Sequence, residues 1–233
     1  MRLRILSPLD WRFTISITKW QSKLKIPLAP PERISNKLIL VGNGAQDGVV
    51  YLILAHKYDG RYSIGITTTA ETREGAIPHI PTIIRELNIE KLVFSLDQES
   101  NELANLKTLL EEKMRTHAIT PNLKEEQSRL YVYDCTHSQR QFELIVAVNG
   151  LDDPSYTQHT IEDHLLSFFK EMTNNDEILV ETLNRVQGNP KEAWNLLRNH
   201  HEEVYQNLLQ KGINELERFF PQQVESIKRL KSN

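Results

Sequence analysis

The chain has 233 residues, of which 39% are hydrophobic and 25% are charged, and its formal net charge is −3. These values exclude a disordered chain and a coiled coil, and the negative charge excludes a protein that is basic over its whole surface. The one cysteine, Cys135, excludes an intramolecular disulfide framework and a cysteine-rich zinc site, and it points to a reducing compartment. The longest apolar run, around residues 49–55, is too short to cross a membrane. We therefore expect a cytoplasmic protein with no membrane partner.

Residues 1–36 form a basic segment in which the acids are Asp10 and Glu32 and the bases are Arg2, Arg4, Arg12, Lys19, Lys23, Lys25 and Arg33. Residues 12–20, RFTISITKW, alternate polar and apolar side chains, which predicts a half-buried strand. Three prolines between residues 27 and 31 predict a linker or an extended arm. We expect an N-terminal extension outside the core fold, or an edge hairpin, in preference to an arm that contacts phosphates.

Residues 37–41, KLILV, predict a buried strand, and a glycine-rich turn, GNGAQDG, follows at residues 42–48. Its glycines let the backbone turn tightly and approach a ligand closely. The apolar run at 49–55 completes a strand–turn–helix unit, although its β-branched residues also fit a strand. The third glycine is misplaced for a dinucleotide-binding fingerprint and a P-loop lysine is absent, so the turn alone assigns no nucleotide.

Strands and helices alternate along the rest of residues 37–173. Periodicity predicts strands at 62–69, 90–96, 130–134 and 142–148, and helices at 80–87 and 101–117. In the second helix one apolar stripe is formed by Leu103, Leu106, Leu110 and Met114. The alternation predicts an α/β domain with a mainly parallel sheet.

The C-terminal part of the chain is predicted to be helical. Thr160 is placed to cap a helix whose first turn contains Glu162 and Asp163. From residue 174 onward glycine is scarce and no strand pattern is visible, so residues 174–233 are predicted to form a helical appendage. Trp194 and the pair Leu208 and Leu209 are its expected buried anchors, against the α/β domain or against a second copy of the chain in a homo-oligomer.

The strand at 90–96 is followed by two carboxylates, Asp97 and Glu99. Side chains two residues apart point to the same side of a strand, and ligands of open α/β sheets bind at the carboxyl ends of strands. Two acids held together are explained by a bound cation or by a solvated edge. The alternative is that both acids open the following helix, where its dipole favours negative charge.

Taken together, residues 37–170 resemble a Toprim (topoisomerase–primase) domain of the overcoming-lysogenization-defect nuclease type and its small stand-alone relatives. LILVGNGAQDG resembles the first strand and turn, HIPTIIRELNIEKLVFSLDQES the helix and strand that end in the acidic motif, and IVAVNGLDDPSYTQHTIEDHLLSFF the last core strand and its helix. The resemblance implies a parallel core flanked by helices. It also implies a glutamate in the first turn, an Asp-x-Asp motif at a later strand end, and an acid downstream.

The resemblance implies a site for Mg²⁺ or Mn²⁺ and for nucleic acid. The implied catalytic residues are Asp97, Glu99 and Glu162, and the implied metal ligands are Asp97, Glu99 and Asp163. The implied phosphate-binding turn consists of Gly42, Asn43, Gly44 and Asp47. Mg²⁺ is commonly held by one or two carboxylates together with waters and substrate phosphates.

The sequence departs from the family pattern at two positions, and these departures leave two functional hypotheses. Asn43 or Gly42 stands where the turn glutamate belongs, and the acidic motif reads Asp97-Gln98-Glu99. One hypothesis is a metal-dependent nucleic-acid-processing protein that acts on phosphodiester bonds. The other is a non-catalytic binding or regulatory module that kept the fold and lost the activity.

Histidines and Ser95 are weaker candidates. His159 and His164 lie near the acidic helix start, and we expect both to be surface histidines. His200 and His201 are adjacent on a helix and point apart, which argues against a metal site. Ser95 lacks the glycine pattern of a nucleophile elbow.

Overall fold

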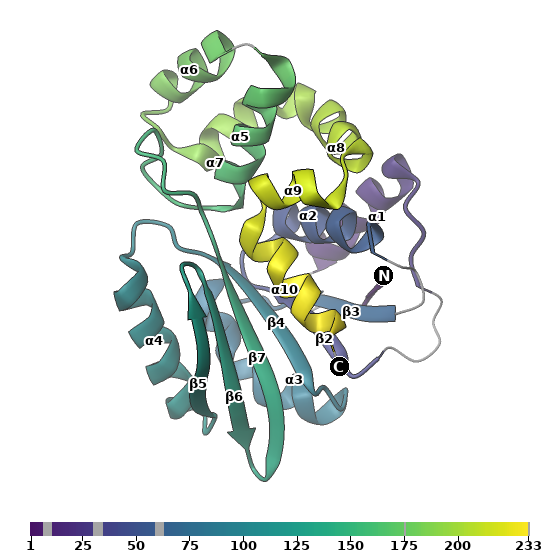
Figure 1. Ribbon diagram of the computed structural model, residues 1–233, viewed down its shortest axis with the longest axis vertical. Helices are drawn as coiled ribbons and strands as arrows, with labels where there is room; N and C mark the ends of the chain where they lie inside the picture. Colours follow the sequence, from purple (N-terminus) through teal and green to yellow (C-terminus); the bar gives the residue numbers. More distant parts are fainter. Residues whose placement is uncertain (7–10, 30–34, 59–62, 175, 233) are drawn as a thin grey trace.

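The computed structural model describes residues 1–6, 11–29, 35–58, 63–174 and 176–232. These residues form a mixed α/β fold around one twisted sheet with helices on both faces (Figure 1). The strands are β1 (Arg2–Ile5), β2 (Lys37–Val41), β3 (Ser63–Thr68), β4 (Lys91–Asp97), β5 (Thr120–Gln127), β6 (Leu130–His137) and β7 (Arg140–Asn149). Their order across the sheet is β1-β3-β2-β4-β7-β6-β5.

The sheet is parallel from β1 to β7, and β6 and β5 continue it as an antiparallel hairpin. The chain passes from β2 to β3 on one side and then crosses back to β4 on the other. The gap between the carboxyl ends of β2 and β4 is therefore a topological switch point, where open α/β sheets bind ligands. The predicted mainly parallel sheet is confirmed, and within it β2 pairs directly with β4.

Alternating side chains of the strands enter two hydrophobic cores. Leu38 and Leu40 of β2 pack with α3 (Ile80–Glu86), α4 (Leu103–Thr116) and the 3₁₀ turn η1 (Arg73–His79). Ile39 and Val41, from the same strand, pack on the other face with the remaining helices. Those helices are α1 (Trp11–Leu24), α2 (Ala45–His56), α5 (Ile161–Thr173), α6 (Asp176–Arg185), α7 (Pro190–Leu196), α8 (His201–Gln210), α9 (Ile213–Phe219) and α10 (Pro221–Lys231).

The predicted strand at residues 12–20 is wrong, because this segment lies in helix α1. Phe13, Ile17 and Leu24 are buried, and their spacing of four and seven residues places them on one helix face. Over nine residues the same sequence also alternates, so the period of two was misleading. The extension is also joined to the sheet, since β1 pairs with β3, and α1 packs on α2.

The apolar run at 49–55 lies in α2, so the expected strand–turn–helix unit is confirmed and the strand alternative is wrong. The run is buried along its whole length, which explains its uniform hydrophobicity. The edge strand β5, with the sequence TPNLKEEQ, was not predicted. Its side chains are mostly polar and exposed, and charge and proline are typical of strands at a sheet edge. Periodicity therefore offered no signal for it.

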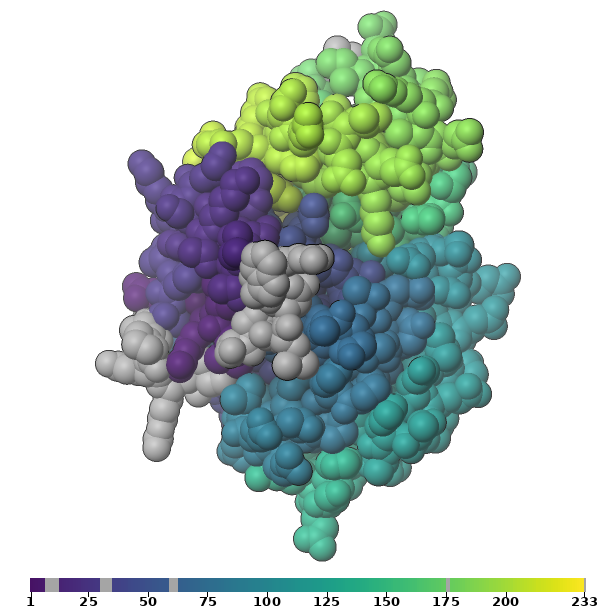
Figure 2. All heavy atoms as spheres, turned by 180° about the vertical axis from the view of Figure 1, so that it is seen from behind, coloured from purple at the N-terminus to yellow at the C-terminus, as the bar shows by residue number. Residues whose placement is uncertain are grey.

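The predicted helical character of the C-terminal segment is confirmed for its described residues. Trp194 and Leu208 are buried, and Leu209 is partly buried. α10 runs back across the sheet and packs on β4 and β7 (Figure 1). The view from behind shows the yellow-green region that contains α8 lying beside the purple N-terminal residues (Figure 2), and α8 contacts α1. None of the helices in the described residues is long and apolar enough to span a membrane.

The place of α1 in the core can be tested with two substitutions on opposite faces of that helix. Phe13 is 2% exposed, and we expect Phe13→Ala to lower the free energy of unfolding by about 3–5 kcal/mol because it leaves a cavity. Ile15 is 56% exposed, and Ile15→Ala should cost no more than about 0.5 kcal/mol. Urea titration of both variants measures this difference. Equal, near-zero effects would place α1 outside the core.

Candidate functional site

Three buried carboxylates and one amide meet at the carboxyl edge of the parallel strands. Asp97 ends β4, and Asn149 ends the neighbouring strand β7 in direct register with it. Asp47 lies in the first turn of α2, which follows β2, and Glu162 lies in the first turn of α5. The exposed fractions of Asp47, Asp97 and Glu162 are 1%, 1% and 7%. Parallel topology thus gathers side chains that are far apart in sequence.

The amide of Asn149 joins two of these carboxylates. Its Nδ2 donates to Asp47 Oδ1 at 2.5 Å and to Asp97 Oδ1 at 3.0 Å. Its Oδ1 accepts from Gln223 Nε2 of α10 at 2.7 Å and from Ser95 Oγ at 3.3 Å. Both ends of the amide are therefore engaged, which fixes its orientation and the spacing of the two acids.

The glycine-rich turn lies directly against the acidic strand end. Asn43 Oδ1 accepts a hydrogen bond from the backbone N–H of Asp97 at 2.9 Å. Gly42 N donates to Ser95 O at 2.7 Å, and a Cβ at Gly42 would lie 3.0 Å from that same oxygen. This close approach of two backbones explains the glycine at position 42.

Lys191 of α7 lies between the two acids of the Asp97-Gln98-Glu99 motif. Its Nζ is 3.0 Å from Asp97 Oδ2 and 3.2 Å from Glu99 Oε1. Arg73 Nη1 contacts the other oxygen of Glu99 at 2.8 Å. Each acid of the motif therefore has a basic side chain of this chain as its partner.

Asp97 and Glu99 do not come together by strand alternation. β4 ends at Asp97, and Glu99 has a φ of 56°. Glu99 instead exchanges two backbone hydrogen bonds with His159, at 2.8 and 3.0 Å. The alternative in which both acids open the next helix is also wrong, because α4 begins at Leu103.

The predicted Mg²⁺ or Mn²⁺ ligands do not fit a metal ion in this arrangement. The Lys191 ammonium stands between Asp97 and Glu99, where the cation was expected. Asp163 forms a capping box, and its oxygens accept from Thr160 N at 3.1 Å and Leu151 N at 3.2 Å. Within the described residues no three His, Cys, Asp or Glu side chains lie together in a way that could hold a metal ion. Asp163 is thus a helix-capping residue.

Burial changes the proton affinity of the cluster. Burial, together with the charges of Asp97 and Glu162, raises the pKa of Asp47 well above its ordinary value. Burial also raises the pKa of Asp97, although Lys191 and the amide of Asn149 oppose this change. The pKa of Glu162 rises to about 7, through burial and then the nearby Asp97. Glu162 Oε2 also has no hydrogen-bond partner among the described residues.

The expectation that His164 is a surface residue is wrong, since its side chain is fully buried. Its Nε2 accepts from Gly150 N at 3.0 Å, and its Nδ1 faces Phe219 O. Burial lowers the pKa of this imidazole to about 4, so it is neutral near pH 7. His164 therefore links the loop after β7 to the end of α9. His159 is partly exposed beside Asp163.

The structure brings together Asn43, Asp47, Asp97 and Glu162 from the predicted site, with Glu99 at the far side of Lys191. Sequence reasoning missed Asn149, Lys191 and Arg73. Asn149 had a usable signal, because it ends a predicted parallel strand whose neighbour ends in Asp97. Lys191 had none, because 92 positions separate it from Glu99.

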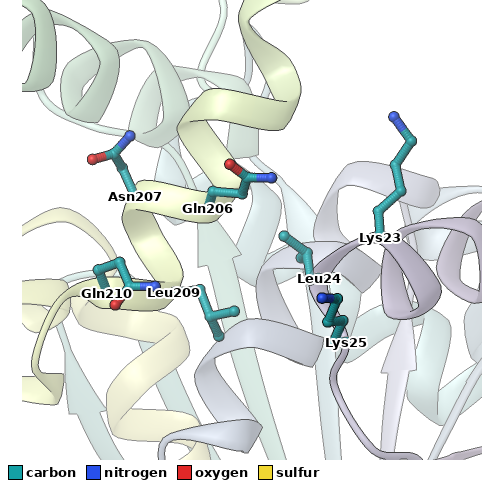
Figure 3. A pocket seen from close by; sticks show the side chains of 7 residues that line it. All are labelled: Lys23, Leu24, Lys25, Gln206, Asn207, Leu209 and Gln210. Carbon is teal, nitrogen blue, oxygen red and sulfur yellow. The ribbon is translucent and has the colours of Figure 1, made fainter.

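A pocket lies between the ends of α1 and α8, away from the acidic cluster. This pocket of about 380 Å³ is lined by Lys23, Leu24, Lys25, Gln206, Asn207, Leu209 and Gln210 (Figure 3). Lys23 lies in the last turn of α1 and Lys25 directly follows that helix, where positive charge offsets the helix dipole. None of its lining residues belongs to the acidic cluster. The helix end thus explains the position of the two lysines, and the pocket is separate from the candidate site.

Comparison with known proteins gives no match: the chain matches no family model, no curated protein and no solved structure.

The raised pKa of Glu162 predicts a pH dependence of stability. Folding raises this pKa from an ordinary value of 4.5 to about 7, so the folded protein binds the proton more tightly. The resulting stabilisation is complete below about pH 4.5 and is lost as the pH rises through about 7. Glu162→Gln removes this loss, so between pH 5 and 8 the variant should lose roughly 2–3 kcal/mol less stability than wild type.

Urea titrations at pH 5, 6, 7 and 8 measure the difference. Glu171→Gln, at an exposed position of the same helix, is the matched control and should keep the wild-type slope. Parallel slopes for wild type and Glu162→Gln would show that Glu162 is ionised in the folded protein throughout this range.

Proposed function

We propose that this chain is a non-catalytic binding or regulatory module with a Toprim-like core. Support comes from the arrangement of the elements. A glycine-rich turn after β2 contacts the end of β4, and a further acidic helix start follows β7. This is the order of strand, turn and acid that the resemblance implies for the family. The resemblance also makes nucleic acid the ligand class to test first.

The observation that carries the proposal is the side chain of Asn43. The family places a glutamate in this turn, and general acid–base chemistry needs a group that can gain or lose a proton. An amide cannot do this, although its oxygen can accept a hydrogen bond. Asn43 uses that oxygen to hold the backbone N–H of Asp97 at 2.9 Å. The turn residue thus has a structural role, and the proton-transfer group of the family is missing.

Metal-dependent phosphodiester cleavage is the second candidate. It is favoured by the convergence of Asp47, Asp97 and Glu162, because strongly perturbed buried acids cluster at functional sites. Asp97, Glu99 and Glu162 are its catalytic residues. This candidate requires a site in which Lys191 has left the acids, and it assigns no proton-transfer role to the turn.

The two candidates differ in a cleavage assay. Labelled single-stranded and duplex DNA and RNA are incubated with wild-type protein in millimolar Mg²⁺ or Mn²⁺. We expect no metal-dependent cleavage above the level of the double variant Asp97→Asn with Glu99→Gln, which keeps shape and removes both charges. Cleavage by wild type that disappears in the double variant would refute the non-catalytic proposal and establish the second candidate.

A further inference from the structure

We propose that the Lys191 ammonium is a built-in counter-ion that takes the place of a divalent cation between Asp97 and Glu99. The site then needs no metal for its stability, and loss of the lysine creates a cation site in this chain. The inference rests on the proposed function, because it concerns the same acidic edge. It names the Lys191 ammonium of α7 as the group that neutralises the acids at this edge.

The contacts of Asp97 leave one of its two oxygens to Lys191. Asp97 Oδ1 is already occupied by Asn149 Nδ2 at 3.0 Å and by the N–H of Ile161 at 3.2 Å. Oδ2 is the remaining oxygen of a side chain that is 1% exposed, and it faces Lys191 Nζ at 3.0 Å. Since the same Nζ lies 3.2 Å from Glu99 Oε1, the ammonium bridges two carboxylates as a bound cation would.

Two basic side chains of this chain face the two acids. Arg73 Nη1 lies 2.8 Å from Glu99 Oε2, and its Nε lies at the longer distance of 3.5 Å from Glu74 Oε2. Lys191 and Arg73 therefore place two positive charges beside Asp97 and Glu99. One Mg²⁺ would bring the same charge. Removing one partner of a buried pair leaves an uncompensated charge, which is strongly unfavourable. A divalent cation placed beside Lys191 would be repelled by the positive charge of the lysine ammonium.

The start of α7 holds Lys191 in position. Asn189 caps this helix through Oδ1, which accepts from Glu192 N at 3.2 Å. Gly188 has a φ of 77° and its carbonyl accepts from Thr157 N at 2.9 Å. Trp194, one turn beyond the lysine, is fully buried. The lysine backbone is therefore anchored on both sides, in a way that a loose surface lysine is not.

The test compares Mn²⁺ binding and thermal stability in full-length protein. Lys191→Met removes the charge and keeps the length of the side chain, whereas Lys191→Arg keeps the charge. Lys211→Met is the matched control, because it removes a lysine from an exposed pair with Glu215. Bound Mn²⁺ is measured from the loss of the free-ion signal in electron paramagnetic resonance, and melting is followed by circular dichroism with and without Mn²⁺.

We expect wild type, Lys191→Arg and Lys211→Met to bind no Mn²⁺ at millimolar concentration. We expect Lys191→Met to melt roughly 5 °C or more below wild type, because Asp97 loses its partner. Millimolar Mn²⁺ should restore most of this loss, since a ligand that binds only the folded state stabilises it. Adding Asp97→Asn to Lys191→Met should abolish the response to Mn²⁺.

A folded Lys191→Met protein that neither binds Mn²⁺ nor changes its melting temperature in Mn²⁺ would overturn the inference. Mn²⁺ binding by wild type that is lost in Asp97→Asn would also overturn it. If Lys191→Met is unfolded without metal, recovery of its fold by Mn²⁺ supports the inference and absence of recovery refutes it. The proposed function fails on a separate readout, which is metal-dependent cleavage by wild type.

Discussion

The structure depends on how it accommodates ionisable carboxylates inside the protein at the end of its central strands. Burying an ionised carboxylate without partners is so unfavourable in free energy that the group takes up a proton or the fold is destabilised. Asn149 supplies one N–H₂ group to both Asp47 and Asp97, and Lys191 supplies a charge to Asp97. The turn after β2, the start of α5 and the first turn of α7 all reach this edge to complete the arrangement.

This constraint explains the role of the C-terminal helices. They cover one face of the sheet, and they also contribute polar groups to its carboxyl edge. Lys191 comes from α7, and Gln223 of α10 holds the oxygen of Asn149. The helical appendage predicted from composition is therefore joined to the candidate site. In the proposed non-catalytic module, the ammonium of Lys191 lies between Asp97 and Glu99, the two acids from which a cation site was expected.

The sequence was informative where a local pattern and the tertiary environment agree. The strands KLILV and KLVFSLD are buried on both sides, so continuous runs of β-branched and aromatic residues identified them. RFTISITKW fits two periods over its short length, and TPNLKEEQ has no apolar pattern at all. In the candidate site, Asp97 and the glycine turn follow predicted strands and were found. Lys191 and Arg73 act through contacts across the fold, which no local pattern encodes.

Lys191 and Gln223 are far along the chain from Asp97 and Asn149, the residues that they contact, and this separation affects how the protein folds. The parallel strands β2, β4 and β7 are complete by residue 149, but Lys191 and Gln223 are synthesised later. Contacts of such long sequence separation form late and slow folding. While the chain is still growing, Asn149 is already available to Asp47 and Asp97, but Asp97 lacks the ammonium of Lys191, and protonation is the alternative way to neutralise it. The contacts at the strand ends are therefore completed only after α7 and α10 have been synthesised.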